Sequence, residues 1–443
     1  MSLSLQPGPR SGFVRVPSSK SQLHRLLILA ALGRKTVRIN RTGRSNDVSA
    51  TAACLNALGA RIREDAEGFT VIPFPRDEEG RLIRSTGNSW LLLPCGESGA
   101  TLRMMLPLAG LLGRKVCLER EGRLAERPIA PLDRVLTAHG MEFRESGLRL
   151  FVSGELTGGV FALPGNVSSQ FVTALLLVLP FLEGDSVLRV GAPVESSSYI
   201  ALTEQVLGKA SITFEKADIA HQIPKEQDQT ALTLVWDPLY WISGRQQADL
   251  PDEIQAEGDF SAAAVFLCIG ALSPKGMGVL GLQPETVQGD QSILDFLQAM
   301  GAEMGATPEV VAIRGGKLKG IRVDAAQVPD LVPALAVTAA AAEGDTIIQN
   351  AGRLRLKESD RLESTAALIR ALGGSCDITE GTLVVHGGQL HGGSVSAAKD
   401  HRLAMAAAIA ACEADGPIEL DDPDCVAKSY AAFWQDFGAL QTE

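Results

Sequence analysis

The stretch TLRMMLPLAGLLGRKVCLE, residues 101–119, indicates how this chain folds. It predicts an almost uncharged helix, then a glycine turn, then a strand. A helix that is apolar all round must be buried, because it has no face suited to water. Five further stretches repeat this order of helix, turn and strand: residues 23–39, 170–190, 260–281, 332–349 and 402–420.

A second helical pattern follows each of these stretches and ends in a glycine before another strand-like run. Glycine relieves the strain of the left-handed conformation at a helix end, so each glycine predicts a helix stop. The six are Gly59, Gly140, Gly208, Gly301, Gly373 and Gly438. The chain is therefore predicted to be α/β. It repeats a unit of buried helix, strand, surface helix and strand, with a closing hairpin.

The repeats also predict how the chain divides. Three units run from about residue 20 to 214 and three from about 259 to 440. The irregular stretch between them is rich in Gln, Pro and charged residues, so we expect a domain boundary late in it, near residues 251–255. A chain of 443 residues also exceeds one ordinary core, which favours two domains.

The net charge of −11 disfavours a nucleic acid or an anionic membrane as partner, because their phosphates would be repelled. No apolar stretch approaches the roughly 20 residues of a membrane helix, and the N-terminus shows no secretory signal. Any anion that this protein binds must therefore be held by a local cluster of Lys and Arg.

The seven cysteines form no CxxC pair, which predicts reduced thiols and a cytoplasmic location. No His or Cys cluster has the spacing of a metal site, and no phosphate-binding loop motif is present. Gly276, Gly278 and Gly281 match a dinucleotide fingerprint, but they follow a predicted helix and enter a strand, which is the reverse of the required order. The sequence therefore predicts neither a metal nor another cofactor.

Polar residues gather where the predicted helices begin. Helix N-termini offer free backbone N–H groups and the positive end of the dipole, so several aimed at one cleft predict an anion site. A single Ser, Asp or Asn there is usually only a helix cap. Cations are disfavoured at such positions, and a bound anion would remove the conflict. The basic residues at or just after helix starts are Lys20, Arg25, Arg103, Arg127 and Lys357.

The segment KESDRL, residues 357–362, is a special case. Its spacing predicts that Lys357, Glu358 and Arg361 lie on one face of a helix. Among the six histidines only His401 stands out, because Asp400 and Arg402 flank it at the head of a buried helix.

These motifs resemble those of the EPSP synthase family. PSSKSQLHR, CGESGATLR, ERPI, SSQF, EGD, KESDRL, DHRLAM and AKSY occur in the family's order over essentially the whole chain. The resemblance implies a two-domain enolpyruvyltransferase-like fold, with three βαβαββ units and buried helices in each domain (an inside-out α/β barrel). It implies an N-terminal domain of residues 19–252 and a C-terminal domain formed by residues 1–18 and 253–443.

The activity implied by the resemblance is transfer of the enolpyruvyl group from phosphoenolpyruvate to the 5-hydroxyl of shikimate 3-phosphate, with release of phosphate. This is a step of aromatic amino-acid biosynthesis. These two small molecules are the expected partners, and nothing in the sequence calls for more than a monomer.

The resemblance also assigns residues. Those expected to bind shikimate 3-phosphate are Lys20, Ser21, Arg25, Ser168, Ser169, Gln170, Ser196, Asp330 and Lys357. Those expected to bind phosphoenolpyruvate are Lys20, Gly99, Arg127, Gln170, Arg361, Arg402 and Lys428. Those expected to support the site are Asp47, Arg103, Asp259 and His401.

Three of these residues are expected to be catalytic. Glu358 is expected to carry the proton to and from C3 of phosphoenolpyruvate, and Asp330 to orient or deprotonate the 5-hydroxyl. Lys20 is expected to act as an acid and to stabilise the departing phosphate. Closure of the two domains on their ligands is expected to exclude water.

Two alternatives remain at this stage. A UDP-N-acetylglucosamine enolpyruvyltransferase shares the fold and the donor, but would usually carry a reactive cysteine in a loop, whereas Cys117 is predicted to lie in a buried strand. A non-catalytic binding paralogue would lack one of Lys20, Asp330, Glu358 or Arg402, and all four are present. Departures from the commonest family pattern occur at Glu97, Ala100, Arg353 and Ser197–Ser198.

Overall fold

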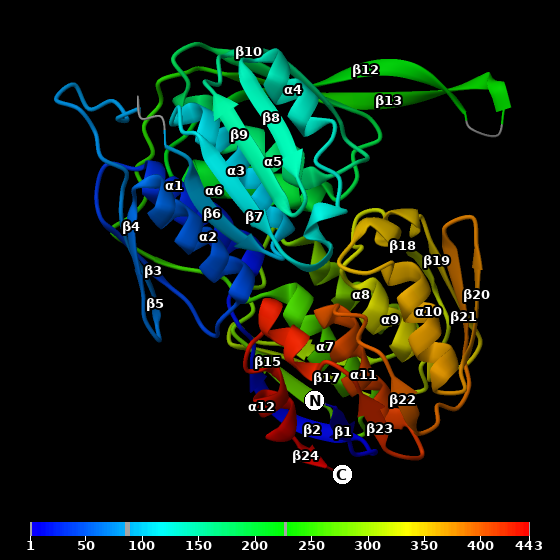
Figure 1. Cartoon of the computed structure of the whole chain (residues 1–443). Helices are drawn as coiled ribbons and strands as arrows, with labels where there is room; N and C mark the ends of the chain where they lie inside the picture. The colour runs from blue at the N-terminus through cyan, green and yellow to red at the C-terminus, as the bar shows by residue number, and fades with distance from the viewer. Residues whose placement is uncertain (1, 85–88, 226–227, 443) are drawn as a thin grey trace. The chain divides into compact units, whose positions relative to one another are not determined.

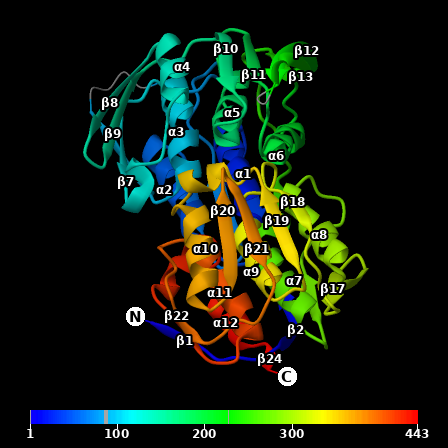
Figure 2. The same ribbon diagram turned by 90° about the vertical axis from the view of Figure 1, so that its right-hand side faces the viewer.

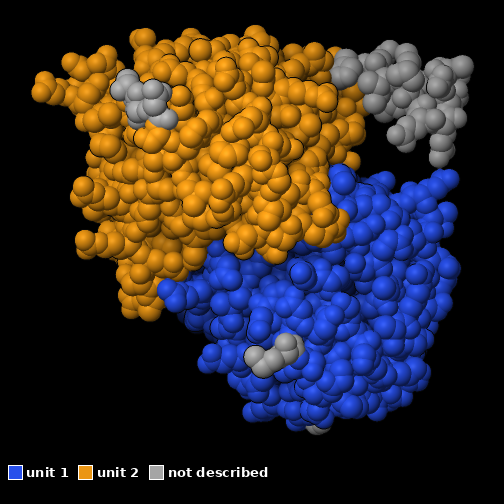
Figure 3. All heavy atoms as spheres, viewed as in Figure 1, with its two compact units in different colours: residues 1–20, 41–46, 256–443 blue, residues 21–40, 47–255 orange. Residues whose placement is uncertain are grey.

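The computed structural model describes residues 2–84, 89–225 and 228–442. The chain forms two compact units, coloured separately in Figure 3. Unit 1 comprises Met1–Lys20, Arg41–Asn46 and Ala256–Glu443. Unit 2 comprises Ser21–Asn40 and Asp47–Gln255. The chain therefore starts in unit 1, passes through unit 2 and returns.

One sheet of unit 2 shows the repeating pattern most completely (Figure 1). Strand β6 runs parallel to β7, β7 pairs antiparallel with β9, and the hairpin β8–β9 closes the sheet in the order β6-β7-β9-β8. Along the chain the elements are β6 (Leu91–Gly96), α3 (Gly99–Leu111), β7 (Val116–Arg120), α4 (Leu132–Ala138), β8 (Met141–Ser146) and β9 (Arg149–Gly154). This order is the predicted βαβαββ unit.

The other two sheets of unit 2 follow the same order. The first is β14-β3-β5-β4, with β14 (Glu253–Gln255), β3 (Val37–Asn40), β5 (Gly68–Ile72) and β4 (Arg61–Glu64). The second is β10-β11-β13-β12, with β10 (Gly159–Pro164), β11 (Ser186–Gly191), β13 (Asp228–Ile242) and β12 (Glu215–Lys225). Their helices are α1 (Lys20–Leu32), α2 (Asn46–Leu58), α5 (Ser169–Leu176) and α6 (Ser197–Lys209). Because β14 pairs in parallel with β3, residues 253–255 belong to unit 2.

Unit 1 contains the remaining three sheets. In the first, of order β16-β17-β15-β2-β24, the strands are β16 (Glu303–Ala306), β17 (Val310–Arg314), β15 (Met277–Leu280), β2 (Arg10–Arg15) and β24 (Gln441–Thr442). In the second they are β18 (Arg322–Asp324), β19 (Asp345–Gln349), β21 (Thr382–His386) and β20 (Ser375–Thr379). The third joins β1 (Leu3–Leu5), β23 (Ile418–Leu420) and β22 (Gly393–Val395). The N-terminal strands β1 and β2 thus complete sheets of unit 1, and none of the described sheets closes on itself.

Three nearly uncharged helices form the centre of unit 1: α7 (Phe260–Leu272), α9 (Val332–Ala340) and α11 (His401–Glu413). They pack on one another and are buried along almost their whole length. Helix α10 (Arg361–Ala371) packs against α9, α11 and β20 (Figure 2). The other outer helices are α8 (Ile293–Met300) and α12 (Phe433–Gly438). In unit 2 the equivalent buried helices are α1, α3 and α5. The predicted buried helices are therefore confirmed in both units.

The predicted glycine stops are correct in four of six places. Gly59, Gly140, Gly301 and Gly373 have φ values of +114°, +101°, +109° and +79°. Gly208 and Gly438 were predicted wrongly, because both lie inside the last turn of their helices, α6 and α12. After α6 the left-handed residue is Ser211, with φ of +58°. A glycine near a helix end need not adopt the left-handed conformation, so its position alone does not define where the helix stops.

The glycine-rich turn before β15 and the cysteines also agree with the sequence expectations. Gly276 occupies the turn before β15 and Gly278 lies within that strand, so the dinucleotide fingerprint is correctly rejected. All seven cysteines are free thiols, and Cys117 is buried in β7. Within the described ranges, no helix is both long and apolar enough to cross a membrane.

Gly59 and Gly208 offer a matched test of the backbone argument, because an added Cβ would meet nothing within 4 Å at either. Gly59→Ala should lower the free energy of unfolding by about 1–2 kcal/mol, because φ is positive. Gly208→Ala should raise it by up to about 1 kcal/mol, because alanine favours a helix. Urea unfolding measures both, and equal shifts for the two variants would contradict the assignment.

Candidate functional site

The buried helices of unit 1 begin with carboxylates. Asp259 caps α7 by accepting a hydrogen bond from the N–H of Ala262 at 3.0 Å. Asp400 caps α11 by accepting one from the N–H of Arg402, also at 3.0 Å. Asp330 lies just before α9. These caps satisfy N–H groups that the helices themselves cannot pair.

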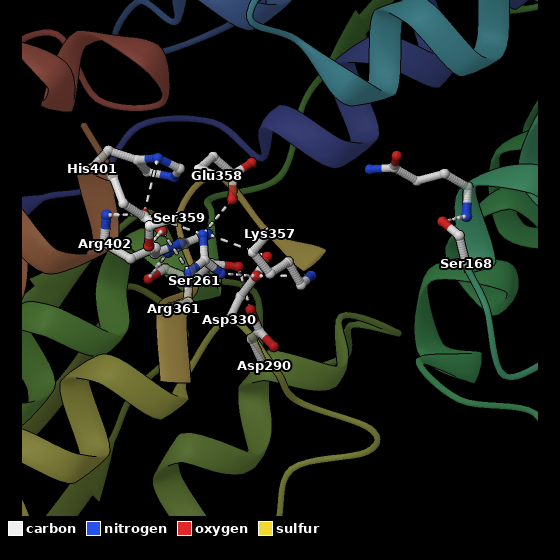
Figure 4. A network of polar contacts seen from close by, with 12 residues as sticks. Ser168, Ser261, Asp290, Asp330, Lys357, Glu358, Ser359, Arg361, His401 and Arg402 are labelled. Atoms are coloured by element: carbon white, nitrogen blue, oxygen red, sulfur yellow. Dashed lines mark hydrogen bonds and ion pairs between the residues drawn. The ribbon is translucent and has the colours of Figure 1, made fainter. Parts of the chain in front are cut away.

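Arg361 connects the starts of α9 and α11 (Figure 4). Its guanidinium is only 1% exposed and contacts three carboxylates. Nε donates to Asp400 Oδ2 at 2.8 Å, Nη1 to Asp330 Oδ1 at 2.7 Å and Nη2 to Glu358 Oε2 at 2.5 Å. Ser359 donates a further hydrogen bond to Asp400 Oδ2 at 3.1 Å. A planar guanidinium can bridge several carboxylates in this way, whereas the ammonium of lysine is a point charge.

Two further cations approach Asp330. Lys357 Nζ lies 3.4 Å from Oδ1 and Arg402 Nη2 lies 3.6 Å from Oδ2. Burial opposes ionisation of Asp330, but the charges of Lys357, Arg402 and Arg361 hold its pKa well below the usual range. Burial in turn lowers the pKa of Lys357, although Asp330 counteracts this. Asp330 is therefore an ionised hydrogen-bond acceptor at neutral pH.

One prediction about this cluster is wrong. Lys357 and Glu358 are not on a helix, because α10 begins only at Arg361. Asp360 is the N-cap, and its carboxylate accepts from the N–H of Glu363 at 3.2 Å. The three side chains nevertheless meet, because residues 357–360 form a bend between the short 3₁₀ helix Gly352–Leu356 and α10.

The same correction applies to Arg127, which was also expected at a helix start, and Lys428 has a similar place. Arg127 lies in a turn after the 3₁₀ helix Gly122–Ala125 and before α4, not at a helix start. Lys428 is the last residue of the 3₁₀ helix Pro423–Lys428, before α12. Short 3₁₀ segments precede the outer helices at these places, and sequence periodicity does not reveal them.

Lys20 and His401 lie beside the same cluster in unit 1. The backbone N–H of Lys20 donates to Asp259 Oδ2 at 3.0 Å. His401 is 2% exposed, and among the described residues neither ring nitrogen has a hydrogen-bond partner, although Nδ1 lies 3.7 Å from Asp400 Oδ1. Burial lowers the pKa of His401 well below its usual range, and the positive charges of Lys20 and Arg402 act in the same direction. His401 is thus a neutral imidazole at physiological pH.

In unit 2 the most unusual group is Arg25, which is 2% exposed. All four of its hydrogen-bond partners are neutral oxygens: Thr203 Oγ1 at 2.9 Å, Thr173 Oγ1 at 3.1 Å, Tyr199 O at 2.9 Å and Ser21 O at 2.5 Å. Within the described residues it has no carboxylate partner, and burial lowers its pKa to about 9. A buried cation without a counter-charge is suited to bind an anion.

A second cationic group of unit 2 surrounds the first residue of α3. An added Cβ on Gly99 would lie 2.8 Å from Nη1 of Arg103 and of Arg127, so a larger residue here would require both guanidiniums to move. Arg103 Nη1 donates to Gln170 Oε1 at 2.6 Å and Nη2 to the carbonyl of Pro128 at 2.9 Å. Gly99, Arg103, Arg127 and Gln170 are therefore brought together by the fold.

The remaining residues of unit 2 occupy helix starts. Ser168 caps α5, and its Oγ accepts from the N–H of Gln170 at 3.3 Å (Figure 4). Ser169 is buried at the first position of α5. Ser196 occupies the N-cap position of α6 without a side-chain cap hydrogen bond, has φ of +54° and is 2% exposed. Asp47 is buried in the first turn of α2, and its backbone carbonyl accepts from Thr101 Oγ1 at 3.2 Å.

Three residues of unit 1 belong to the cluster although the sequence did not assign them to the site: Asp400, Asp290 and Ser261. Asp400 holds Arg361 and caps α11, as described above. Ser261 Oγ donates to Asp290 Oδ2, and the Ser261 carbonyl accepts from Arg402 Nη1 at 2.8 Å. Asp400 could have been found as an acidic N-cap beside a buried arginine. Asp290 carried a similar signal, because it is an acidic residue at the start of a surface helix, whereas Ser261 carried none, because its partner Arg402 is 141 residues away.

The unit 1 cluster offers two kinds of chemistry. Buried cations can hold phosphate and carboxylate groups, and carboxylates among them can accept or donate protons. Among the described residues, no group of three or more His, Cys, Asp or Glu side chains could hold a metal ion.

Comparison with known proteins gives a consistent result. The sequence pattern of the family described as EPSP synthase (3-phosphoshikimate 1-carboxyvinyltransferase) matches residues 5–437. A 3-phosphoshikimate 1-carboxyvinyltransferase of Clostridium kluyveri is 35% identical over 447 residues, which cover 100% of this chain and 97% of the relative. One of Clostridioides difficile is 35% identical over 453 residues and covers 99% and 97%.

Solved structures are similar in fold. An EPSP synthase from Acinetobacter baumannii superposes with a TM-score of 0.75 at 21% identity, covering 100% of this chain and 99% of that one. The enolpyruvyl transferase NikO from Streptomyces tendae gives a TM-score of 0.72 at 20% identity, covering 100% and 98%. These likenesses confirm the predicted fold class.

Arg361 and Arg355 provide a matched test of the cluster. Arg361→Lys should lower the free energy of unfolding by about 3 kcal/mol or more, because one lysine cannot pair three buried carboxylates. Arg355→Lys should change it by less than about 1 kcal/mol, because Arg355 is 41% exposed and makes surface ion pairs with Asp360 and Glu363. Urea unfolding of both variants measures the difference, and a small effect at Arg361 would contradict its central role.

Proposed function

The chain belongs to the EPSP synthase (3-phosphoshikimate 1-carboxyvinyltransferase) family, and from this premise we propose which residues perform its reaction. The enzyme transfers the enolpyruvyl group of phosphoenolpyruvate to shikimate 3-phosphate in the shikimate pathway. Both substrates are polyanions, since together they carry two phosphates and two carboxylates. The observation that best supports the residue assignment is the cluster of Lys357, Arg361 and Arg402 around Asp330.

Unit 2 supplies most of the proposed shikimate 3-phosphate contacts. Arg25 carries a buried charge without a carboxylate partner among the described residues, so we assign it to the carboxylate of this substrate, together with Ser21, which lies one turn earlier in α1. Ser168, Ser169 and Ser196 occupy starts of α5 and α6, where N–H groups and hydroxyls suit the phosphate. The proposed contacts from unit 1 are Lys20, Asp330 and Lys357.

Phosphoenolpyruvate is assigned mainly to the cations of unit 1. Arg361, Arg402, Lys428 and Lys20 are buried or half-buried, so their charges act in surroundings with little screening. A charge-assisted hydrogen bond contributes about 1.5–3 kcal/mol, and a few such bonds suffice for a small anion. The proposed contacts from unit 2 are Gly99, Arg127 and Gln170, and the proposed supporting residues are Asp47, Arg103, Asp259 and His401.

The reaction is an addition followed by an elimination. In the addition, the 5-hydroxyl oxygen bonds to C2 of phosphoenolpyruvate while C3 gains a proton and the hydroxyl loses one. In the elimination, C3 loses a proton, the double bond re-forms and the bond from C2 to the phosphate oxygen breaks. One group near C3 can serve both proton steps, because it donates a proton to C3 in the addition and accepts one from C3 in the elimination.

Glu358 is the proposed proton carrier at C3. Its carboxylate contacts Arg361 at 2.5 Å, which holds it in place. Its side chain is 11% exposed, so a substrate can still reach it. Asp330 is proposed to orient the 5-hydroxyl. The surrounding cations lower its pKa, so it is better suited to accept a hydrogen bond from the hydroxyl than to remove its proton. Lys20 is proposed to donate a proton and to stabilise the leaving phosphate.

The alternatives considered from sequence have no observation in their favour. Cys117 is buried in β7, so it is not the exposed loop cysteine typical of a UDP-N-acetylglucosamine enolpyruvyltransferase. We also propose that the protein acts as a cytoplasmic monomer with an N-terminal domain of residues 19–252 and a C-terminal domain of residues 1–18 and 253–443. These bounds differ from the two compact units at residues 19–20, 41–46 and 253–255. The free thiols support the cytoplasmic location.

The first test is substrate dependence. Purified protein should release phosphate only when phosphoenolpyruvate and shikimate 3-phosphate are both present, because the hydroxyl of the acceptor is the nucleophile. A phosphate-release assay with each substrate omitted in turn measures this. Turnover with UDP-N-acetylglucosamine in place of shikimate 3-phosphate would overturn the assignment.

The second test concerns Glu358. Glu358→Gln should reduce kcat by at least about a hundredfold, because the amide cannot exchange the C3 proton. Binding of shikimate 3-phosphate, measured by calorimetry, should change little. Glu363→Gln is the matched control, since Glu363 is 50% exposed in the next turn and should retain near-normal turnover. Near-normal rates for Glu358→Gln would exclude it as the proton carrier.

A further inference from the structure

A loop of unit 1 packs against the start of α7. Gln288 Oε1 accepts from the N–H of Phe260 at 3.2 Å, and its Nε2 donates to the carbonyl of Gly258 at 2.8 Å. Two residues later, Asp290 Oδ2 accepts a hydrogen bond from the hydroxyl of Ser261. Residues 288–290 therefore hold residues 258–261 from one side.

The segment held in this way positions two of the proposed phosphoenolpyruvate ligands. Asp259 Oδ2 accepts from the backbone N–H of Lys20 at 3.0 Å. The Ser261 carbonyl accepts from Arg402 Nη1 at 2.8 Å, while Arg402 Nη2 is directed toward Asp330 Oδ2 at 3.6 Å. Arg402 and Ser261 are 141 residues apart in sequence, so their alignment depends on how firmly Ser261 is held.

Asp290 is the charged member of this loop and is only 3% exposed. The charged groups that act on it are the carboxylates of Asp330 and Asp259, at the starts of α9 and α7, and the guanidinium of Arg402 on α11. Figure 4 shows Asp290 next to Asp330, on the side of the cluster away from His401. A negative charge here partly neutralises the field that Arg402 presents to an anion.

We propose that Asp290 is a positioning residue for phosphoenolpyruvate binding, which holds Arg402 in place through Ser261 and tunes the positive charge at that site. This inference rests on the proposed function of Arg402 and goes beyond it, because Asp290 is not among the residues assigned to either substrate and is proposed to act through Ser261 and Arg402. Asp290 has two separable effects: its hydrogen bond to Ser261 strengthens the site, and its negative charge weakens the attraction for an anion.

The charge of Asp290 also makes phosphoenolpyruvate binding depend on pH. Burial, together with the nearby charge of Asp330, raises the pKa of Asp290 to about 6. Its carboxyl is therefore neutral at pH 5 and ionised at pH 7.5. The attraction between Arg402 and an anion should weaken as the pH rises through this range.

The experiment compares three variants with the wild-type protein. Asp290→Asn retains an acceptor for Ser261 but removes the charge, whereas Asp290→Ala removes both. Asp295→Asn is the matched control, because Asp295 is exposed in the first turn of α8, next to this loop. KM for phosphoenolpyruvate, KM for shikimate 3-phosphate and kcat are measured from pH 5 to pH 8.

The two Asp290 variants should shift KM for phosphoenolpyruvate in opposite directions. Asp290→Asn should match the wild type at pH 5 and show a KM about threefold lower at pH 7.5. Asp290→Ala should raise it about tenfold at pH 5, because Arg402 is less well held, and only about threefold at pH 7.5, because the variant also lacks the opposing charge. KM for shikimate 3-phosphate should stay within about twofold in both variants. The substrate's own titration cancels in the ratio of variant to wild type.

Two measurements keep the test decisive. If Asp290→Ala does not fold, Ser261→Ala breaks the same link by removing one hydroxyl and should raise KM for phosphoenolpyruvate in the same way. Urea unfolding without substrates follows the titration independently of activity. Because the folded-state pKa of Asp290 is raised, its ionisation costs stability as the pH rises from about 4 to about 6. Asp290→Asn should therefore be more stable than the wild type at pH 7.5 but not at pH 4.

The outcomes separate this inference from the proposed function. A ratio of KM values near one at every pH for both Asp290 variants, as for Asp295→Asn, would overturn it. Equal loss of binding for both substrates would also overturn it, since that indicates a purely structural role. If the wild-type protein turned over neither substrate but Asp290→Asn still altered the pH dependence of unfolding, the proposed function would fail while the titration of Asp290 stood.

Discussion

The buried guanidinium of Arg361 is the interaction on which the unit 1 cluster depends. It joins Asp400 at the start of α11, Asp330 before α9 and Glu358 in the bend before α10. Each of these carboxylates would be costly to bury alone, and the single cation offsets all three. The starts of three helices are thereby held around one point. Lys357 and Arg402 add two more positive charges. Among the ion pairs of the described residues, both have Asp330 as their carboxylate partner.

Unit 2 handles its cations differently. Arg25 is as deeply buried as Arg361, but its partners are hydroxyls and carbonyls in place of carboxylates. Its charge is therefore not balanced by a carboxylate, and burial lowers its pKa to about 9. By contrast, despite its burial, the neighbouring carboxylates raise the pKa of Arg361. At the start of α3, Gly99 has no side chain, so the guanidiniums of Arg103 and Arg127 can lie close to its Cα. Both arrangements leave positive charge available for an anionic substrate, at some cost to stability in its absence.

The sequence predicted the fold more accurately than the geometry of the site. The nearly uncharged helices were identified because an apolar helix has one possible environment, and α7, α9 and α11 are buried as expected. The helix proposed for Lys357 and Glu358 was wrong, because the cap at Asp360 starts α10 later than the spacing suggested. Gly208 and Gly438 were also misjudged, since a glycine near a helix end need not adopt the left-handed conformation.

By itself the sequence determined which residues are apolar enough to be buried, which are charged, and in what order they follow, so the repeating unit and the candidate residues could be predicted. Only the tertiary structure decided which of those charges meet. Ser261, Asp290 and Arg402 lie far apart along the chain, yet one carbonyl and one hydroxyl join them. Periodicity reports local faces of helices and strands, whereas hydrogen bonds between distant helix starts depend on how the buried helices pack.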